Sequence, residues 1–114
     1  MMSTRDTIQS YYNSLKQKEG WESFLADEMT FINNGKQLKG KDAALEGFGR
    51  FFSMVHSLEV KEFLIEDEKA SAVIRYALQS PNGKTFFSDV AEFVTIKNGK
   101  FVSFAIYFDT APYS

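Results

Sequence analysis

No cysteine occurs among the 114 residues of this chain, and that absence excludes disulfide bonds, thiolate metal sites and cysteine nucleophiles. The chain has one histidine, and its acidic cluster at 66–68 falls in an expected turn, so we expect no metal and no cofactor. No apolar run approaches the roughly 20 residues of a membrane span, and the N-terminus has the pattern of a capped helix rather than a signal peptide. We expect a cytoplasmic protein without membrane contact.

An excess of charge of one sign is also missing. The 13 basic and 15 acidic residues give a formal net charge of -2, and the two signs are interspersed. Because a nucleic-acid-binding protein needs a basic face for the phosphates, we expect no nucleic acid partner. Aromatic residues are abundant by contrast, with 12 Phe, 5 Tyr and 1 Trp. A surplus beyond what a core needs indicates a cavity or an interface.

Apolar residues at helical spacing predict three helices in the N-terminal half. The first follows a capping-box pattern at 3–6, makes about four turns and ends near Gly20. A shorter second helix places Trp21, Phe24 and Leu25 on one face. Asp42 is expected to cap the third helix. Its buried stripe consists of Leu45, Phe48, Phe51, Phe52 and Val55.

Two glycines lie within the third helix. Gly47 and Gly49 each weaken it by about 1 kcal/mol relative to alanine. The usual reason for such a glycine is close packing, so we expect another element to lie tightly against the helix there.

The C-terminal half is expected to be all strand. The expected strands cover 59–65, 71–79, 85–96 and 101–109, after a short strand at 29–33, a turn at 34–35 and resumed pairing at 37–38. Helices that precede an antiparallel meander are typical of the α+β class. We expect a single domain over residues 1–114, in which a strongly curved antiparallel sheet wraps around the helices as a cone with an internal pocket, a cystatin-like α+β roll.

The segment 86–109 is apolar at both alternating sets of positions, so we expect this part of the sheet to be covered on both faces. Glu92 lies within it, between Ala91 and Phe93. Burying a carboxylate is costly unless a partner meets it or its pKa rises. Glu92 is therefore the first candidate for a residue that handles protons.

Three stretches carry a family resemblance: FLADEMTF after the second helix, LKGKDAALEGF at the start of the third, and NGKFVSFAIYFD near the end. The resemblance that they carry extends over nearly the whole chain, with the elements in the same order throughout. In them the chain resembles the nuclear transport factor 2-like superfamily, which includes ketosteroid isomerases, SnoaL-like polyketide cyclases and limonene epoxide hydrolases. The resemblance implies the cone fold. It does not select one activity, because this scaffold hosts isomerases, dehydratases, hydrolases and binding modules.

The resemblance also implies where catalytic residues would lie. Ketosteroid isomerases place an oxyanion-binding tyrosine on the first helix, a base at the end of the first strand and a protonated acid on the penultimate strand. The matching positions are Tyr12, Asn33 and Glu92, and Asn33 cannot take a proton. The paired aspartates of limonene epoxide hydrolases match Arg75 and Ile106, so that route to an activated water is absent.

Which side chains face the pocket depends on strand register, and therefore on the turns. A two-residue turn at 98–99 sets Glu92 opposite Ala105, and a three-residue turn at 97–99 sets it opposite Phe104. We favour the latter, since the pocket-facing positions of the resembling enzymes match that register. With a further two-residue turn at 82–83, the pocket-facing residues are Val73, Arg75, Ala77, Ser88, Val90, Glu92, Phe104, Ile106 and Phe108. Asp89, Phe93, Tyr107 and Asp109 then lie on the opposite face, although register leaves Asp89 and Asp109 open.

Three functions remain open on these residues. The first is a site for a small apolar ligand with one oxygen or carboxylate. Its polar groups would be Arg75 and Glu92, and its rim or wall would include Tyr12, Asn33 and His56. The second is an isomerase, cyclase or dehydratase in which Glu92 donates or shuttles a proton and His56 supplies the base. The third is a non-catalytic interaction or ligand-carrier module that works through the convex face of the sheet.

Each candidate residue also has a structural interpretation. Glu92 and Arg75 can form an ion pair across neighbouring strands, Tyr12 can be core, and His56 can be a surface residue at a helix end. The convex face would expose an apolar patch, and we therefore expect a two-fold homodimer. The expected patch comprises Tyr76, Phe93, Phe101, Ala105 and Tyr107.

Overall fold

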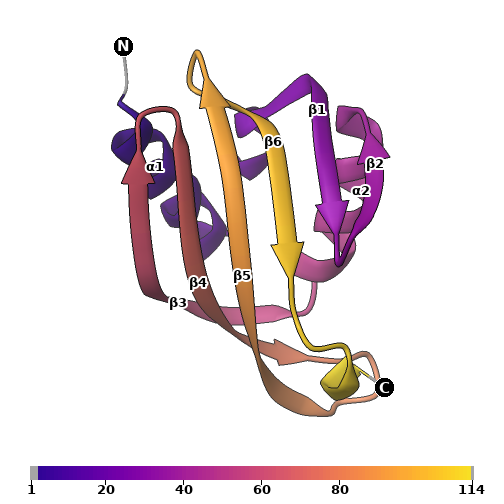
Figure 1. The fold of residues 1–114 in the computed structure, drawn as a ribbon. Helices are drawn as coiled ribbons and strands as arrows, with labels where there is room; N and C mark the ends of the chain where they lie inside the picture. The colour runs from indigo at the N-terminus through magenta and orange to yellow at the C-terminus, as the bar shows by residue number, and fades with distance from the viewer. Residues whose placement is uncertain (1–2, 114) are drawn as a thin grey trace.

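The computed structural model describes residues 3–113 and confirms the α+β class (Figure 1). In chain order the elements are α1 (Thr4–Gln17), the 3-10 helix η1 (Trp21–Phe24), β1 (Leu25–Asn33), β2 (Lys36–Lys39), α2 (Lys41–Phe52), β3 (Val55–Glu66), β4 (Lys69–Gln79), β5 (Thr85–Lys97), β6 (Lys100–Tyr107) and the 3-10 helix η2 (Ala111–Tyr113). Among the described residues, no helix has the length and apolar character needed to cross a membrane.

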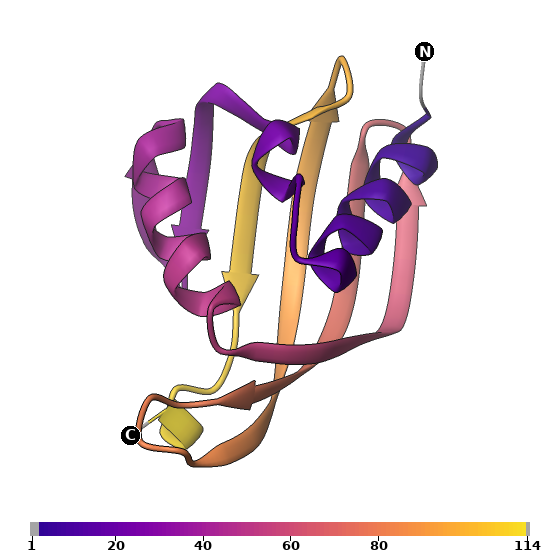
Figure 2. The same cartoon turned by 180° about the vertical axis from the view of Figure 1, so that it is seen from behind.

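The strands form one six-stranded sheet in the order β2-β1-β6-β5-β4-β3. All neighbours are antiparallel except β1 and β6, which are parallel. Both α-helices cover the same face, as the view from behind shows, with α2 over the β1–β2 side and α1 over the β3–β4 side (Figure 2). The sheet curls around the helices without closing, because its edge strands β2 and β3 do not pair. We call the helix-covered face the inner face and the opposite one the outer face.

The first helix begins as the sequence predicts. The Ser3 hydroxyl accepts a hydrogen bond from the Asp6 backbone N–H at 3.1 Å, and the helix ends where Lys18 adopts a left-handed φ of 62°. The expected second helix is wrong in part: it is a single 3-10 turn, and Leu25 already begins β1 because it enters the sheet beside Phe101.

The start and end of α2 differ from the prediction. Gly40, not Asp42, is the residue before the helix, because its φ of 95° lets the chain turn out of β2 while its N–H donates to the Met29 carbonyl at 2.9 Å. Asp42 lies in the first turn, where a carboxylate favours the helix dipole. Val55 belongs to β3 rather than to the apolar stripe of α2.

The hairpin from β5 to β6 departs from both registers considered above. The turn has two residues, Asn98 and Gly99, with left-handed φ of 52° and 74°. Val102 is then an extra residue on β6, since Ile96 pairs with Phe101 and Thr95 with Ser103. This bulge shifts the register by one, so Glu92 pairs with Ile106 instead of Phe104 or Ala105. The expected face is nevertheless right, because a shift of two residues from Phe104 keeps even positions opposite even ones.

The hairpin from β4 to β5 overturns the expected face of β4. Gln79 pairs with Thr85, so the loop has five residues instead of the two-residue turn at 82–83. The loop has three residues more than expected, and because three is an odd number, every β4 side chain faces the opposite side of the sheet from the one predicted. Tyr76 therefore faces inward and Arg75 outward, the reverse of the prediction.

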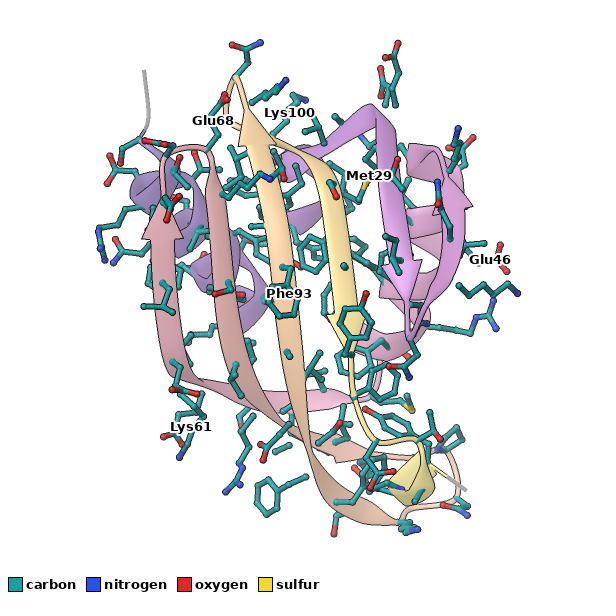
Figure 3. The ribbon with its side chains drawn as sticks, in the orientation of Figure 1. Met29, Glu46, Lys61, Glu68, Phe93 and Lys100 are labelled. Atoms are coloured by element: carbon teal, nitrogen blue, oxygen red, sulfur yellow. The ribbon has the colours of Figure 1, made fainter. Side chains whose placement is uncertain are left out.

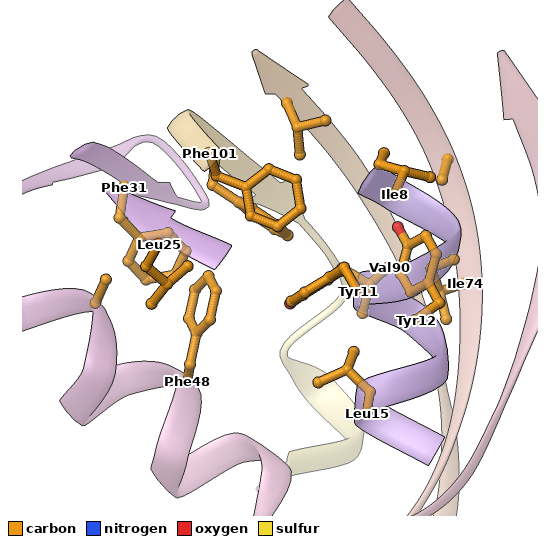
Figure 4. Packing of buried hydrophobic residues seen from close by; sticks show 14 of the residues in the cluster. Ile8, Tyr11, Tyr12, Leu15, Leu25, Phe31, Phe48, Ile74, Val90 and Phe101 are labelled. Carbon is orange, nitrogen blue, oxygen red and sulfur yellow. The ribbon is translucent and has the colours of Figure 1, made fainter. Parts of the chain in front are cut away.

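The core fills the space between the inner face and the two α-helices (Figure 4). Phe48 of α2 packs edge-on against Phe31 and Phe104 with ring centroids 4.7 Å and 5.0 Å apart. Tyr11 of α1 does the same against Phe101 at 4.7 Å. Aromatic side chains from α1, α2, β1 and β6 thus meet over the centre of the sheet, where a site would be dry.

Candidate functional site

A buried carboxylate held by two tyrosines lies at the centre of the inner face. The Tyr12 hydroxyl donates to Oε1 of Glu92 at 2.6 Å, and the Tyr76 hydroxyl donates to Oε2 at 2.6 Å. Glu92 is 3% exposed, Tyr12 4% and Tyr76 1%. Three elements meet here, since the residues come from β5, α1 and β4. We call this group the Tyr–Glu–Tyr cluster.

Burial governs the ionisation of this cluster. Loss of hydration raises the pKa of Glu92 from 4.5 to about 7, although the hydrogen bonds from Tyr12 and Tyr76 lower it. The same burial, together with the nearby Glu92 charge, raises the pKa of Tyr12 and Tyr76 well above the usual range of tyrosine. The tyrosines therefore remain protonated donors, and Glu92 exchanges its proton near neutral pH.

The local sequence accounts for this convergence. Tyr12 lies one helical turn after Ile8 and shares its buried face of α1. On the sheet, Ala72 faces Glu92 and Tyr76 faces Ser88, with the pair Ile74 and Val90 between them on the same face. The small side chain of Ala72 directly opposite Glu92 leaves the carboxylate free for the two hydroxyls.

Glu92 and Tyr76 line a small cavity of about 60 Å³ between α2 and the sheet. Its walls are mostly aromatic. The lining residues are Tyr11, Phe31, Asn33, Gly47, Phe48, Phe51, Phe52, Tyr76, Val90, Glu92, Phe104, Ile106 and Phe108. Five of the residues predicted at the pocket wall are therefore at the cavity: Asn33, Val90, Phe104, Ile106 and Phe108. Tyr12 does not line the cavity and contacts Glu92 from α1.

Tyr11 adds a free donor to the cavity. Its side chain points from α1 toward Phe48 (Figure 4), and its hydroxyl has no hydrogen-bond partner among residues 3–113. Burial and the nearby Glu92 charge raise its pKa well above the ordinary value, so the hydroxyl keeps its proton. The cavity thus presents a carboxylate that titrates near neutrality and an unpaired O–H.

Two of the candidate residues lie elsewhere, and the predicted pair of Arg75 and Glu92 is wrong. Arg75 is on the outer face, where its guanidinium donates to both carboxylate oxygens of Asp89 at 2.8 Å and 3.1 Å. The five-residue loop after β4 is the reason for this placement. His56 is exposed on β3 with Nε2 2.7 Å from Oε1 of Gln79, because β3 begins at Val55 and carries it away from the cavity.

The structure also shows whether Asp89 and Asp109 face the cavity. Asp89 pairs with Arg75 on the outer face, and Asp109 is exposed and accepts from the Ala111 N–H at 3.0 Å. Neither lines the cavity. Among the described residues, no group of His, Asp and Glu is arranged to hold a metal ion.

Tyr76 and Tyr11 are the site residues that sequence reasoning missed. A partial signal for Tyr76 was present: the set Ala70, Ala72, Ile74, Tyr76 and Leu78 is wholly apolar, whereas the alternate set includes Lys69, Ser71, Arg75 and Gln79, and this difference favours an inward Tyr76. The assumed turn at 82–83 outweighed this pattern. Nothing in the sequence distinguishes Tyr11 from an ordinary core aromatic residue.

Comparison with known proteins places the fold and the site in context. Residues 8–104 match the SnoaL-like domain family. The chain belongs to this family. No curated protein matches the sequence. The match to the SnoaL-like domain family confirms the resemblance to the nuclear transport factor 2-like superfamily.

Solved structures of similar shape share little sequence with this SnoaL-like domain. An NTF2-like protein of unknown function from Burkholderia pseudomallei K96243 has a TM-score of 0.82 at 18% identity, covering 99% of this chain and 95% of the other. A provisionally named SnoaL-like polyketide cyclase from Jannaschia sp. CCS1 gives 0.82 at 12%, with 96% and 88% covered. TerC, co-crystallized with polyporic acid, gives 0.77 at 16%, with 96% and 94% covered. At these identities the likeness establishes the fold alone.

Proposed function

We propose that this SnoaL-like domain binds a small, largely apolar carbonyl compound in the cavity and moves a proton on it, as an isomerase or cyclase does. The observation that carries the proposal is the placement of two groups in one cavity with mostly aromatic walls: the Glu92 carboxyl, whose pKa is about 7, and the free Tyr11 hydroxyl. A base works best when its pKa lies near the working pH. The fold similarity to TerC with polyporic acid supports an oxygenated organic ligand.

The proposed reaction needs one residue to move the proton and another to stabilise the negative charge on the carbonyl oxygen. Ionised Glu92 takes a proton from the carbon next to the carbonyl, and the electron pair of that C–H bond moves toward the carbonyl oxygen. The Tyr11 hydroxyl donates a hydrogen bond to this oxygen as its negative charge grows. Glu92 then returns the proton to another carbon of the same system. Glu92 thus serves as the base that Asn33 cannot provide.

The size of the cavity restricts the ligand. A volume of about 60 Å³ is far below the roughly 300 to 1,000 Å³ of typical ligand sites. Phe51, Phe52 and Phe108 are half-buried at its edge, so these rings are the ones that would move to admit a ring-sized molecule. The cavity alone therefore accommodates only a compact group.

Exchange of the α-protons of cyclohexanone in D₂O, followed by NMR, tests the proposal. We expect the protein to accelerate exchange, with a rate that rises as pH passes about 7 because the ionised form of Glu92 is the base. Glu92→Gln should abolish the acceleration. Tyr11→Phe should lower it by about 100-fold, as loss of an oxyanion donor does.

Asp89→Asn is the matched control, since Asp89 lies on the same strand but on the outer face. It should leave the exchange rate unchanged. Equal acceleration by the native chain and Glu92→Gln would contradict the proton-transfer proposal. Cyclohexanone binding without any acceleration would instead support a ligand carrier.

A second candidate, an interaction module, is favoured by one observation. Four large apolar side chains of the outer face, Leu64, Phe87, Phe93 and Tyr107, are 72%, 67%, 50% and 45% exposed. Phe93 projects from β5 on the side away from the helices (Figure 3). We propose that this outer face forms a homodimer, which is compatible with either role of the cavity.

A further inference from the structure

A second depression lies beside the cavity, where the end of α1, η1, the second half of α2 and the start of β3 come together. Its volume is about 290 Å³. The residues that line it are Leu15, Lys18, Trp21, Gly49, Phe52, Ser53 and Val55. The C-terminal ends of α1 and α2 approach each other here over the inner face (Figure 2). We call this depression the groove.

One aromatic side chain separates the groove from the cavity. Phe52 lines both, and it is only half-buried. Its ring packs edge-on against Trp21 of η1 with centroids 5.0 Å apart, and Trp21 also lies 6.0 Å from Phe48, another cavity residue. A rotation of Phe52 would therefore join the two spaces without moving the backbone of α2.

The two glycines of α2 mark the same two spaces. Gly47 lines the cavity and Gly49 lines the groove. Close packing, expected from the sequence, does not explain them: a Cβ at Gly47 would meet only Phe31 at 3.5 Å, and a Cβ at Gly49 would meet nothing within 4 Å. Neither has a positive φ that would require glycine. Each weakens the helix by about 1 kcal/mol relative to alanine. What they provide is empty space on both sides of Phe48.

The groove carries one charge. Lys18, at the left-handed end of α1, is the only charged residue among those that line it. Its ammonium group forms no ion pair within residues 3–113. A groove whose lining combines apolar side chains with one unpaired lysine complements an apolar chain that ends in an acid.

We propose that the groove is a second part of the ligand site, and that the natural ligand is an elongated keto acid: its carbonyl end lies in the cavity, and its apolar tail passes Phe52 to place a carboxylate at Lys18. This substrate class rests on the proposed function of the cavity. The tail accounts for the space at Gly49 and for the half-buried Phe52 ring that borders both the cavity and the groove.

Three probes separate the parts of this site: cyclohexanone, 4-pentylcyclohexanone and 5-(4-oxocyclohexyl)pentanoate. Trp21, the single tryptophan, reports on groove occupancy by fluorescence, and calorimetry gives the affinities. Burial of two or more methylenes in the groove should make both tailed probes bind at least about tenfold more tightly than cyclohexanone. Only they should change the Trp21 emission.

Variants of α2 and α1 make the test specific. Gly49→Leu fills the groove and should weaken both tailed probes by about tenfold while leaving cyclohexanone unchanged. Lys18→Met should weaken only the carboxylate probe, by about threefold, as expected for an exposed ion pair. Arg50→Leu, an exposed position next to Gly49 that lines neither space, is the matched control and should change nothing.

The outcomes keep the two proposals apart. Tailed probes that bind no more tightly than cyclohexanone, or a Gly49→Leu variant that weakens all three probes equally, would overturn the groove proposal. Neither result bears on α-proton exchange by Glu92. Conversely, tail-dependent binding that Gly49→Leu removes would support the groove even if exchange proved independent of Glu92.

Discussion

Glu92 couples the stability of this fold to pH near neutrality. Its pKa is about 7 in the folded chain, against an ordinary value of 4.5. The folded state therefore holds this proton more tightly than the unfolded state does. The contribution to stability is full below about pH 4.5, falls as pH rises, and is lost above about pH 7.

The first prediction concerns this pH dependence. The free energy of unfolding should fall by about 3 kcal/mol between pH 4.5 and pH 8 through Glu92 alone. Glu92→Gln removes the titration, so the native chain should lose stability relative to the variant as pH rises. Urea denaturation of both proteins across this range measures the difference, in which all other groups cancel. A difference that is constant with pH would show that Glu92 is not buried as described.

The second prediction concerns Tyr76, which we regard as a positioning residue because it acts through Glu92. Tyr76→Phe keeps the ring that packs on Phe51 at 4.8 Å and removes one donor to the carboxylate. The pKa of Glu92 should rise further, since this hydrogen bond lowers it. The loss of stability should be about 2 kcal/mol above the pKa, where the bond is to a charged group, and about half that below it.

An NMR titration of the Glu92 carboxyl carbon in the native chain and in Tyr76→Phe measures the shift directly. Tyr12→Phe is the companion variant, because Tyr12 donates to the other oxygen of the same carboxylate. A pKa that is unchanged or lowered in Tyr76→Phe would contradict the assigned role.

At the scale of single elements, α2 gives up helix stability where it borders the two empty spaces. Its only fully buried side chains are Ala44 and Phe48, so much of the helix serves as a wall and not as core. Gly47 and Gly49, on either side of Phe48, belong to this wall, since Gly47 lines the cavity and Gly49 lines the groove.

The third prediction follows from these glycines. Gly49→Ala should raise the free energy of unfolding by about 1 kcal/mol, because alanine favours a helix and its Cβ meets nothing within 4 Å. Gly47→Ala should gain the same helix propensity, with Phe31 in ordinary contact at 3.5 Å. Thermal and urea denaturation measure both. If instead the variants were destabilised, close packing would be the reason for the glycines and the space argument would fail.

At the scale of the whole molecule, the two faces of the sheet differ in what covers them. The inner face is closed by the helices. The outer face keeps Phe93 and Tyr107 in edge-on contact at 6.0 Å and exposes both. Part of the expected patch is wrong, since Tyr76 and Phe101 are buried in the core, but Phe93, Ala105 and Tyr107 do face outward.

The fourth prediction is that this outer face pairs with a second copy of the chain. Sedimentation should give twice the chain mass of 13.0 kDa at micromolar concentration. Phe93→Glu should give the monomer, because a charge in an apolar interface is costly to desolvate. Gln9→Glu, an exposed position on α1, is the control and should leave the dimer intact. A native chain that sediments as a monomer would exclude the pairing.

The sequence by itself determined the class of fold and the residue at its centre. Helical and alternating periodicities identified α1, α2 and the strands, because local spacing directly reflects which face is buried. The cost of burying a carboxylate singled out Glu92 before any partner was known. The resemblance to the superfamily placed Tyr12 on the first helix, where it meets Glu92.

Only the tertiary structure decided what surrounds Glu92. The bulge at Val102 changed only which β6 residue lies opposite Glu92. The five-residue loop after β4 differs from the expected two-residue turn by an odd number of residues, and it therefore turns every β4 side chain to the other face. As a result, Tyr76 rather than Arg75 lies next to the carboxylate, so its neighbour is a neutral hydrogen-bond donor instead of a positive charge. Loop length is set by turn conformations and by packing far along the chain, so the letters of one strand do not contain it.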